Sequence, residues 1–441
     1  MEELQQSEAR LSQLVEDILA EAKRQGADAA EVSASVDQGL SVSVRKGELE
    51  NLEFNEDHGF AITLYVGQRK GSASTTDAGA IVDTVAAARR IATYTQDDEC
   101  NGLAPAELMP ESLADLDLYH PWEISPEEAT ELAIECEQAG LQTDARLVNS
   151  DGAQVNTQRA TRVYGNSHGF VGAYSGTRQG MSCVLIGEDD EGMQRDYWYT
   201  VARNADHLES ATEVGVQAAE RTLARLSPQS APTGTYPVIF SPQMASGFFG
   251  HLIGAISGGA LYRKASFLLD SLGQQVLPEE ISLIERPHIT AALGSANFDG
   301  DGVATQEKSF VDGGHIASYV LSNYSARKLG LAPTGNAGGV FNLDVVGPQK
   351  APADIVGSIN SGLLVTELMG QGVNGVTGDY SRGAAGFWIE NGAISHPVSE
   401  VTIAGNLRDM YRNITAIGDD VDYRNNIRAP SVLVEQVTVA G

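Results

Sequence analysis

The N-terminal half of the chain alternates between helical and extended spacings of its apolar residues. Residues 9–25 carry apolar side chains every three or four positions, which predicts an amphipathic helix that ends before Gly26. Short alternating runs then predict the strands of an antiparallel meander, at residues 31–36, 40–45, 49–54 and 60–66. Turn-forming residues at 37–39 and 57–59 separate these runs. Residues 78–94 return to a helical spacing, and a proline-containing excursion follows at 96–122.

The same succession of elements then occurs again. Ser125-Pro126-Glu127-Glu128 combines an N-cap, a proline in the first turn and a capping-box glutamate, so it predicts a helix that continues to about Ala139. Strand-like runs follow between residues 147 and 202, and a helix is predicted at 208–226. Both meanders contain His-Gly-Phe, at 58–60 and at 168–170. This repetition indicates a weak internal duplication, although a chance tripeptide match in a Gly-rich chain explains it equally well.

Residues 227–235 contain two prolines and small polar residues, which predicts a linker between domains at 1–230 and 231–441. Beyond it, one long helical pattern at 241–264 precedes many short strand-like runs with glycine turns. That spacing is typical of a largely antiparallel barrel or sandwich. The predicted fold class is therefore α+β. Helices surround antiparallel meanders in the N-terminal domain, and the C-terminal domain is a largely antiparallel, β-barrel-like domain with one buried Gly-rich helix.

The stretch 241–264 is the most distinctive part of the chain. Ser241 is a natural N-cap, Pro242 fits the first turn, and Met244, Phe248 and Leu252 recur every fourth residue. Five glycines interrupt this stretch, at positions 247, 250, 254, 258 and 259. Each glycine costs about 1 kcal/mol in a helix relative to alanine. We therefore expect another group to approach the helix backbone closely.

The charge of the chain is unevenly distributed. The net charge is −30, and residues 232–441 hold only 12 Lys and Arg and 19 Asp and Glu, which leaves 17 and 40 for residues 1–231. An acidic field of this kind disfavours nonspecific nucleic-acid binding. No apolar run is long enough to cross a membrane, and the polar N-terminus is unlike a signal peptide. Three widely spaced cysteines favour free thiols in a reducing, cytoplasmic location.

The sequence contains no complete local motif for metal binding, phosphate binding or serine catalysis. The eight histidines are scattered, and neither Cys-x-x-Cys nor Gly-x-Ser-x-Gly occurs. The run 298–303 has the outline of a calcium loop but lacks its later glycine and glutamate, so we expect a surface turn. The Gly-rich run 333–339 lacks the ending of a P-loop and predicts a turn before a strand at 340–346. His251 is open to three interpretations: a hydrogen-bonded core histidine, a contact to bound peptide, or a catalytic group.

The helix 241–264, followed by Arg263-Lys264-Ala265-Ser266-Phe267, resembles the corresponding helix of the TldD/PmbA (TldE) family of peptidases and gyrase modulators. TldD-type members of that family carry a His-Glu-x-x-x-His zinc motif on this helix and a cysteine ligand much later. With the alignment anchored on Arg263-Lys264, the histidines fall on Gly250 and Ala255, the glutamate falls on His251, and the cysteine falls near Ala384. None of the three ligands is present. The chain thus resembles the PmbA/TldE-type member that lacks the zinc motif, and these four positions form a pseudo-active site.

The resemblance also covers residues 333–342 and 370–398 and implies a function. In the family, a heteromeric metalloprotease uses the zinc of its TldD-type subunit to hydrolyse peptide bonds. The chain would be the metal-free partner, without catalytic residues or a cofactor of its own, and would hold unfolded peptides such as leader peptides or an antitoxin. Formation of a homodimer by the isolated chain is a further alternative. Candidate contacts to peptide in the cleft are Arg263, Asn336, Asn374 and Asp379.

Two other functions remain open at this stage. One is a free-standing metallopeptidase whose ligands come from distant parts of the chain. The other is a regulatory binding protein that acts on DNA gyrase, for which the acidic charge would be suited.

Overall fold

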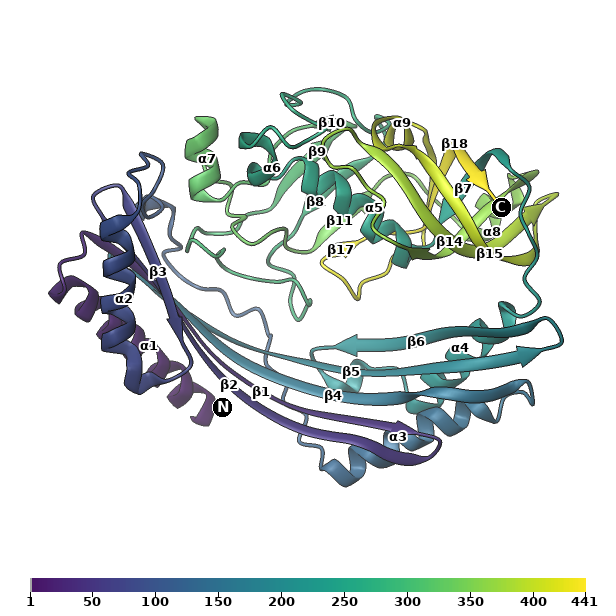
Figure 1. The fold of residues 1–441 in the computed structure, drawn as a ribbon, viewed down its shortest axis with the longest axis horizontal. Coiled ribbons are helices and arrows are strands. Elements are labelled where there is room, and N and C mark those ends of the chain that lie inside the picture. Colours follow the sequence, from purple (N-terminus) through teal and green to yellow (C-terminus); the bar gives the residue numbers. More distant parts are fainter. Residues whose placement is uncertain (1) are drawn as a thin grey trace.

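The computed structural model describes residues 2–441. A strongly curved six-stranded sheet forms one half of the molecule, and a strand-rich second half lies over its concave side (Figure 1). The N-terminal elements are α1 (Glu2–Arg24), β1 (Ala29–Arg45), β2 (Glu48–Val66), β3 (Arg69–Thr75), α2 (Ile81–Tyr94), α3 (Pro126–Leu141), β4 (Leu147–Asn166), β5 (Val171–Asp189), β6 (Gly192–Ala202) and α4 (Ala211–Ala224).

The second half begins with β7 and ends with β18. Its elements are β7 (Gly234–Phe240), α5 (Pro242–Ala255), α6 (Gly258–Tyr262), β8 (Ser282–Glu285), β9 (Lys308–Asp312), β10 (His315–Ile316), α7 (Asn323–Leu329), β11 (Leu343–Val346), β12 (Gln349–Lys350), α8 (Pro352–Gly357), β13 (Ser361–Met369), β14 (Asp379–Glu390), β15 (Ala393–Asn406), α9 (Leu407–Arg412), β16 (Ile414–Gly418), β17 (Ile427–Arg428) and β18 (Val432–Ala440). The fold class is α+β, as predicted.

The N-terminal sheet is symmetric in its order, β3-β2-β1-β4-β5-β6. A helix, three strands and a helix therefore occur twice, and the two units meet where β1 pairs with β4. Helices α1 and α2 cover one end of the sheet and α3 and α4 the other, on the side away from the C-terminal half (Figure 1), and both α1 and α3 pack on β1 and β4. The two His-Gly-Phe sequences are not equivalent, because 58–60 lies inside β2 and 168–170 lies in the turn between β4 and β5.

The predicted turns at 37–39 and 57–59 do not exist. Both segments are paired in the ladder between β1 and β2, so the predicted short strands merge into two long ones. Gly39 is needed here for another reason, since a Cβ at this position would lie 2.7 Å from the carbonyl oxygen of Thr157 on β4. The glycines in these strands permit close approach of neighbouring strands and do not mark chain reversals.

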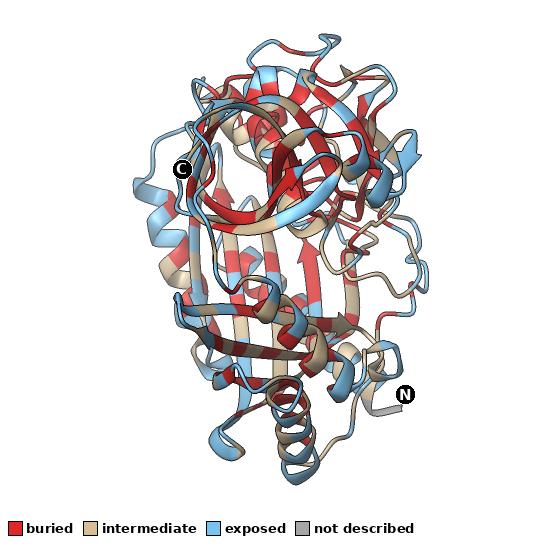
Figure 2. Cartoon of the chain, turned by 90° about the vertical axis from the view of Figure 1, so that its right-hand side faces the viewer, coloured by how far each residue is buried: buried red, intermediate tan, exposed pale blue. Residues whose placement is uncertain are grey.

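The C-terminal half contains a closed, five-stranded β-barrel. The order β7-β13-β14-β15-β18 closes because β18 also pairs with β7, and all neighbours are antiparallel except β7 and β13. Buried residues line the inside of this barrel, which Figure 2 shows nearly end-on. A smaller sheet, β10-β9-β8-β11-β17, lies beside it. The prediction of a largely antiparallel, barrel-like domain is therefore confirmed.

The long predicted helix at 241–264 is two helices, α5 and α6. The chain breaks at Ser257, which forms a parallel bridge to Val320 and precedes α6 as its N-cap. Gly258 then packs directly on α7, because a Cβ here would overlap the side chain of Ser325. Pro242 opens α5 as expected, whereas the buried hydroxyl of Ser241 makes no capping hydrogen bond. The extended backbone that Ser257 needs for its bridge overrides the helical pattern of the sequence.

None of the helices in the described part of the chain combines the length and the apolar character that a membrane crossing requires. All three cysteines are buried and free.

Candidate functional site

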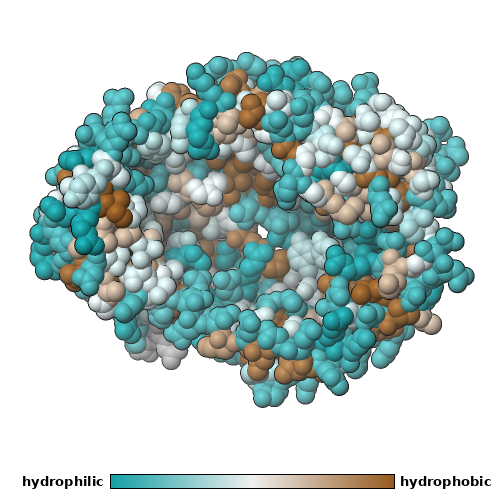
Figure 3. Space-filling view, viewed as in Figure 1, coloured by the Kyte–Doolittle hydropathy of each residue, from teal (hydrophilic) through white to brown (hydrophobic). Residues whose placement is uncertain are grey.

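A cleft of about 840 Å³ lies between the concave face of the N-terminal sheet and loops of the C-terminal half. It belongs to the hollow in the middle of the molecule in Figure 3. The register of the sheet explains its floor: Ser33 on β1 lies opposite both Tyr164 on β4 and Ala61 on β2, so these side chains share one face. Ser74 on β3 pairs with Ala61 and belongs to the same face. Small residues on β1, β2 and β3 therefore lie beside larger ones on β4 and leave room above the sheet.

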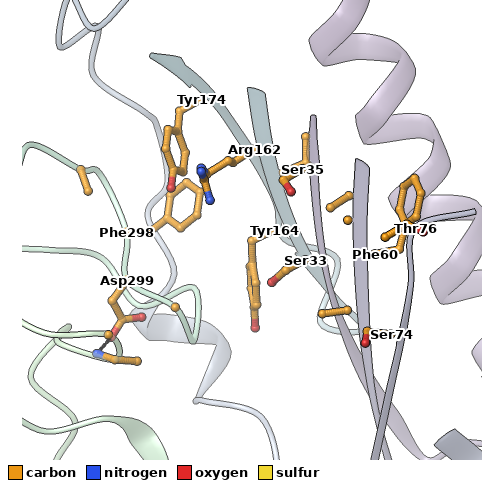
Figure 4. A pocket seen from close by; sticks show the side chains of 18 of the residues that line it. Ser33, Ser35, Phe60, Ser74, Thr76, Arg162, Tyr164, Tyr174, Phe298 and Asp299 are labelled. Atoms are coloured by element: carbon orange, nitrogen blue, oxygen red, sulfur yellow. Dashed lines mark hydrogen bonds between the residues drawn. The ribbon is translucent and has the colours of Figure 1, made fainter. Parts of the chain in front are cut away.

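Aromatic and hydroxyl groups face this cleft together (Figure 4). The Phe298 ring from the C-terminal half meets the Tyr174 ring edge-on, with centroids 5.7 Å apart. Arg162 lies opposite Ser35 and holds an ion pair with Asp37 at 2.9 Å. A cleft of this composition can accept an extended peptide, whose side chains find apolar rings and whose amides find hydroxyl groups.

The wall of the cleft is fixed by Asp299, which is only 3% exposed. Its carboxylate accepts hydrogen bonds from the backbone N–H groups of Asp301 and Val303, both at 2.9 Å, and of Ala337 at 2.8 Å. Burial raises the pKa of Asp299 to about 6. The expectation of a surface turn at 298–303 is wrong, because this turn is buried against the N-terminal sheet and uses its aspartate to hold backbone rather than calcium.

The joint between the two halves lies beside this turn. The hydroxyl of Tyr164 on β4 is 3.0 Å from the Glu31 carboxylate on β1 and 3.0 Å from the Asp301 carbonyl oxygen of the C-terminal half. Tyr65 donates a second hydrogen bond to Glu31, at 2.8 Å. Burial is the main reason why the pKa of Glu31 is raised, and the nearby charge of Asp301 adds to it.

The pseudo-active-site positions lie on α5 and β14. Gly250 and His251 are half-buried near the middle of α5, and Ala255 is buried at its end. Ala384 is fully buried on β14, two positions beyond Arg382 on that strand. The His251 ring lies 6.1 Å, centroid to centroid, from the ring of Tyr380 on β14. Burial lowers the pKa of His251, and the charge of Arg382 lowers it further.

The glycines of α5 do not pack closely. A Cβ at Gly247 or Gly254 would meet no atom within 4 Å, and one at Gly250 would meet only Ile427, at 3.7 Å. Gly247 and Gly254 are exposed, so α5 is buried on its aromatic side and bare on its glycine side. The sequence led us to expect close approach to the backbone at all five glycines, and it is found at Gly258, since a Cβ at Gly259 would meet only the Arg263 side chain, at 3.3 Å.

The four predicted cleft contacts are spread over the C-terminal half. Asn336 is buried, and its amide donates to Glu285 at 2.8 Å while its oxygen accepts from Lys308 at 3.0 Å. Its neighbours in sequence line the cleft in its place, at Ala337 and Gly338. Asn374 and Asp379 lie in the exposed connection before and at the start of β14, and Arg263 is exposed beyond α6, over the Tyr262 ring.

Sequence reasoning missed the residues that line the cleft from the N-terminal sheet. Arg162, Tyr164 and Tyr174 come from two strands and reach the site only through the β1–β4–β5 register. The alternation of polar and apolar positions in β4 and β5 is a usable signal for one common face, but it does not say what lies above that face. At the start of β14, the less exposed Tyr380 and Arg382 alternate with the exposed Asp379 and Ser381.

Comparison with known proteins identifies the relatives of this chain. Residues 30–92, 119–226 and 233–441 match the sequence models of domain 1, the central domain and the C-terminal domain of the PmbA/TldA metallopeptidases. The metalloprotease PmbA of Escherichia coli O157:H7 is 50% identical over 94% of this chain and 92% of its own length. The metalloprotease PmbA homolog of Haemophilus influenzae is 46% identical over 99% of this chain and 98% of its own length.

Solved structures agree with this assignment. A proposed modulator of DNA gyrase from Bacteroides thetaiotaomicron superposes with a TM-score of 0.90 at 28% identity, covering 97% of this chain and 98% of that chain. TldE from Thermococcus kodakarensis has the same fold, with a TM-score of 0.84 at 20% identity over 97% of this chain and all of that chain (100%). The three matched domains together span most of the sequence, and the chain therefore belongs to the PmbA/TldD metallopeptidase family.

Proposed function

We propose that this chain is the metal-free subunit of a TldD/TldE-type metalloprotease complex and that it holds unfolded peptides for a zinc-bearing, TldD-type partner. The side chains at the pseudo-active site carry this proposal. Of the four positions that correspond to the zinc motif and its cysteine, three are Gly250, Ala255 and Ala384, which have no metal-binding side chain. Within residues 2–441, no three His, Cys, Asp or Glu side chains gather in a group that could hold a metal ion.

The cleft supports the role of holding peptides. It is lined by hydroxyl and aromatic groups, and none of the residues that line it resembles an activated nucleophile. In a shared chamber, such a surface would retain an extended chain while the partner supplies zinc and the attacking water. Unfolded peptides such as leader peptides and antitoxins are the substrates that we propose.

The partner subunit needs a surface, and the edge of β2 offers one. Strand β3 pairs only with Phe60–Val66 of β2, so the other half of β2 has one open edge. That half is exposed throughout, and it includes Leu49, Leu52 and Phe54, the last of these 67% exposed. Next to it, Phe54 and Trp122 line a groove of about 310 Å³ in which polar residues such as Gln158 and Arg159 also take part. An unpaired edge with apolar side chains favours association with another chain, either a TldD-type subunit or, in isolation, a second copy.

We also propose a cytoplasmic location, because three buried, unpaired thiols persist best in a reducing compartment.

The decisive experiment is peptide cleavage by the purified chain, alone and mixed with a TldD-type subunit, with zinc quantified in each sample. We expect cleavage only in the mixture and no stoichiometric zinc in this chain. Cleavage by the chain alone together with bound zinc would instead support a free-standing metallopeptidase with dispersed ligands. A partner whose zinc-motif glutamate is replaced by glutamine serves as the control for cleavage by contaminants.

A second function is worth testing because a solved relative is described as a modulator of DNA gyrase. The net charge of −30 would favour binding to a basic surface of gyrase. Direct binding that weakens steeply between low and physiological salt would support it. The absence of binding at every salt concentration would exclude a function in gyrase binding.

A further inference from the structure

An unpaired cation lies at the pseudo-active site. The Nε of Arg382 is buried and has no hydrogen-bond acceptor, and the hydroxyl of Tyr380, a residue only 1% exposed, lies beside the Arg382 side chain and likewise has no acceptor. Among residues 2–441, Arg382 forms no ion pair. Buried polar atoms are nearly always hydrogen-bonded, so two orphans on one strand point to a missing partner.

The orphaned groups lie together. Tyr380 and Arg382 are two residues apart on β14 and point to the same face, and the His251 ring from α5 lies 6.1 Å from the Tyr380 ring. The charge of Arg382 acts on both neighbours: it lowers the pKa of His251, and it opposes the effect of burial, which raises the pKa of Tyr380 to about 12. One guanidinium, one phenol and one imidazole therefore meet between α5 and β14.

This cluster is open on one side. His251 lies between Gly247 and Gly254 on the bare side of α5, where added side chains would meet no other atom. In Figure 1, α5 lies on the side of the C-terminal half that faces the N-terminal sheet. A ligand that lies along this side of α5 can therefore reach His251 without displacing packed side chains.

The charge and the hydrogen-bond donors of His251, Tyr380 and Arg382 favour an anionic ligand. The chain has 59 acidic residues against 29 basic ones, yet within residues 2–441 none of the acidic groups pairs with Arg382. A partly buried guanidinium without a counter-charge is costly, and a carboxylate fits its planar fork with two parallel hydrogen bonds. The Tyr380 hydroxyl and an imidazole N–H are additional donors. Neither a cation nor a metal ion suits a site whose permanent charge is positive.

We propose that His251, Tyr380 and Arg382 form a carboxylate-binding subsite that anchors a bound peptide. The anchored group is a carboxylate, either the C-terminal α-carboxylate of the peptide or an aspartate or glutamate side chain. The subsite takes the place that zinc holds in the partner, so one subunit binds the charged part of the substrate while the other cleaves. Its role in proteolysis rests on the proposed function, but carboxylate binding itself is a property of this chain alone.

The test is peptide binding to the isolated full-length chain, measured by NMR or calorimetry. The probes are an N-acetylated, alanine-rich pentapeptide with a free C-terminal carboxylate, its C-terminal amide, and the amide with a central glutamate. We expect at least one charged probe to bind about 10-fold more tightly than the neutral amide, as hydrogen bonds to a charged group require. The charged probe that binds identifies the source of the carboxylate.

Substitutions then assign the binding to the cluster. Arg382→Gln is expected to weaken binding of the charged probe about 10-fold to 100-fold, whereas Arg90→Gln, which removes an exposed arginine from α2, leaves it unchanged. Tyr380→Phe removes one hydroxyl that has no acceptor in the free protein. It is expected to weaken binding while the melting temperature stays the same or rises, a combination that a purely structural role would not give.

Three results overturn the proposal: equal binding of neutral and charged probes, no binding of any probe, or wild-type binding by Arg382→Gln. The proposed function is tested separately by cleavage in the mixture of subunits. If the mixture cleaves and carboxylate binding is absent, only the subsite is wrong. If carboxylate binding is present and the mixture does not cleave, only the protease role is wrong.

Discussion

The pKa of His251 depends on the charges around its ring. Burial and the nearby Arg382 both lower the pKa of this residue, so the ring is neutral over more of the acidic range than an ordinary histidine. In the free protein, Arg382→Gln is expected to raise the pKa of His251, because one of the two causes is removed. The measurement is an NMR titration of the histidine ring protons, with the His251 signal assigned from His251→Gln. The same pKa of His251 in Arg382→Gln and in the wild type would mean that Arg382 is too far from the imidazole to affect its protonation.

Glycines at two positions of the pseudo-active-site stretch have opposite roles. Gly247→Ala adds a methyl group in open space and is expected to stabilise the fold by about 0.5–1 kcal/mol through helix propensity. Gly258→Ala forces a methyl group onto Ser325 and is expected to destabilise the fold by about 1–3 kcal/mol. Urea denaturation of both variants measures these changes, and two changes of the same sign would contradict the assignment.

At the scale of single elements, the open half of β2 is the surface at which we expect another chain to associate. Leu52→Glu with Phe54→Glu replaces two exposed apolar side chains of this segment by charges, so we expect association with a TldD-type subunit, or with a second copy, to weaken about 10-fold or more. Folding should be unaffected, since both side chains are exposed. Sedimentation at several concentrations measures the effect. Val82→Glu on α2 is the matched control, because Val82 is also exposed, at 55%.

Element prediction succeeds where the signal is local and fails where it depends on neighbours. The capping box at Ser125 and Glu128 is present in the structure and opens α3. The sequence pattern predicts that Gly39 and Gly59 lie in turns. That prediction fails because a single sequence does not show which strand lies alongside a glycine. The break of the predicted helix at Ser257 is not visible in the sequence for the same reason, because it is caused by the bridge to Val320. The helix of the pseudo-active site is recognisable from the sequence, but its neighbours on β14 come from a strand that is distant along the chain.

At the scale of the whole molecule, the joint between the halves depends on pH. The pKa of Glu31 is raised by burial, so the folded state holds its proton more tightly than the unfolded chain does. Stability from this group is therefore greatest at acidic pH and declines as pH rises through the raised pKa. A tenfold difference in proton affinity between the folded and unfolded states corresponds to about 1.4 kcal/mol. Asp299, with a pKa of about 6, acts in the same direction.

We expect Glu31→Gln to remove part of this dependence. Its free energy of unfolding should change less between about pH 5.5 and about pH 8 than that of the wild type, with a smaller loss on the alkaline side. Glu16→Gln, at an exposed position of α1, should behave as the wild type. Urea unfolding at the two pH values gives the comparison, and the same pH dependence in Glu31→Gln and the wild type would exclude this role for the joint.

The symmetric order of the N-terminal sheet has a consequence for engineering. The two halves of the sheet are held together along a single ladder, from Glu31 to Val44 on β1 against β4. The helices and cores also cross this ladder: α1 packs on β4 as well as on β1, and Leu40 and Val42 of β1 belong to the core beneath α3 and α4. A chain cut in the excursion at 96–122 would thus yield two fragments with matching unpaired edges. Such fragments should reassociate spontaneously, which would make this scaffold a natural candidate for a split-protein reporter.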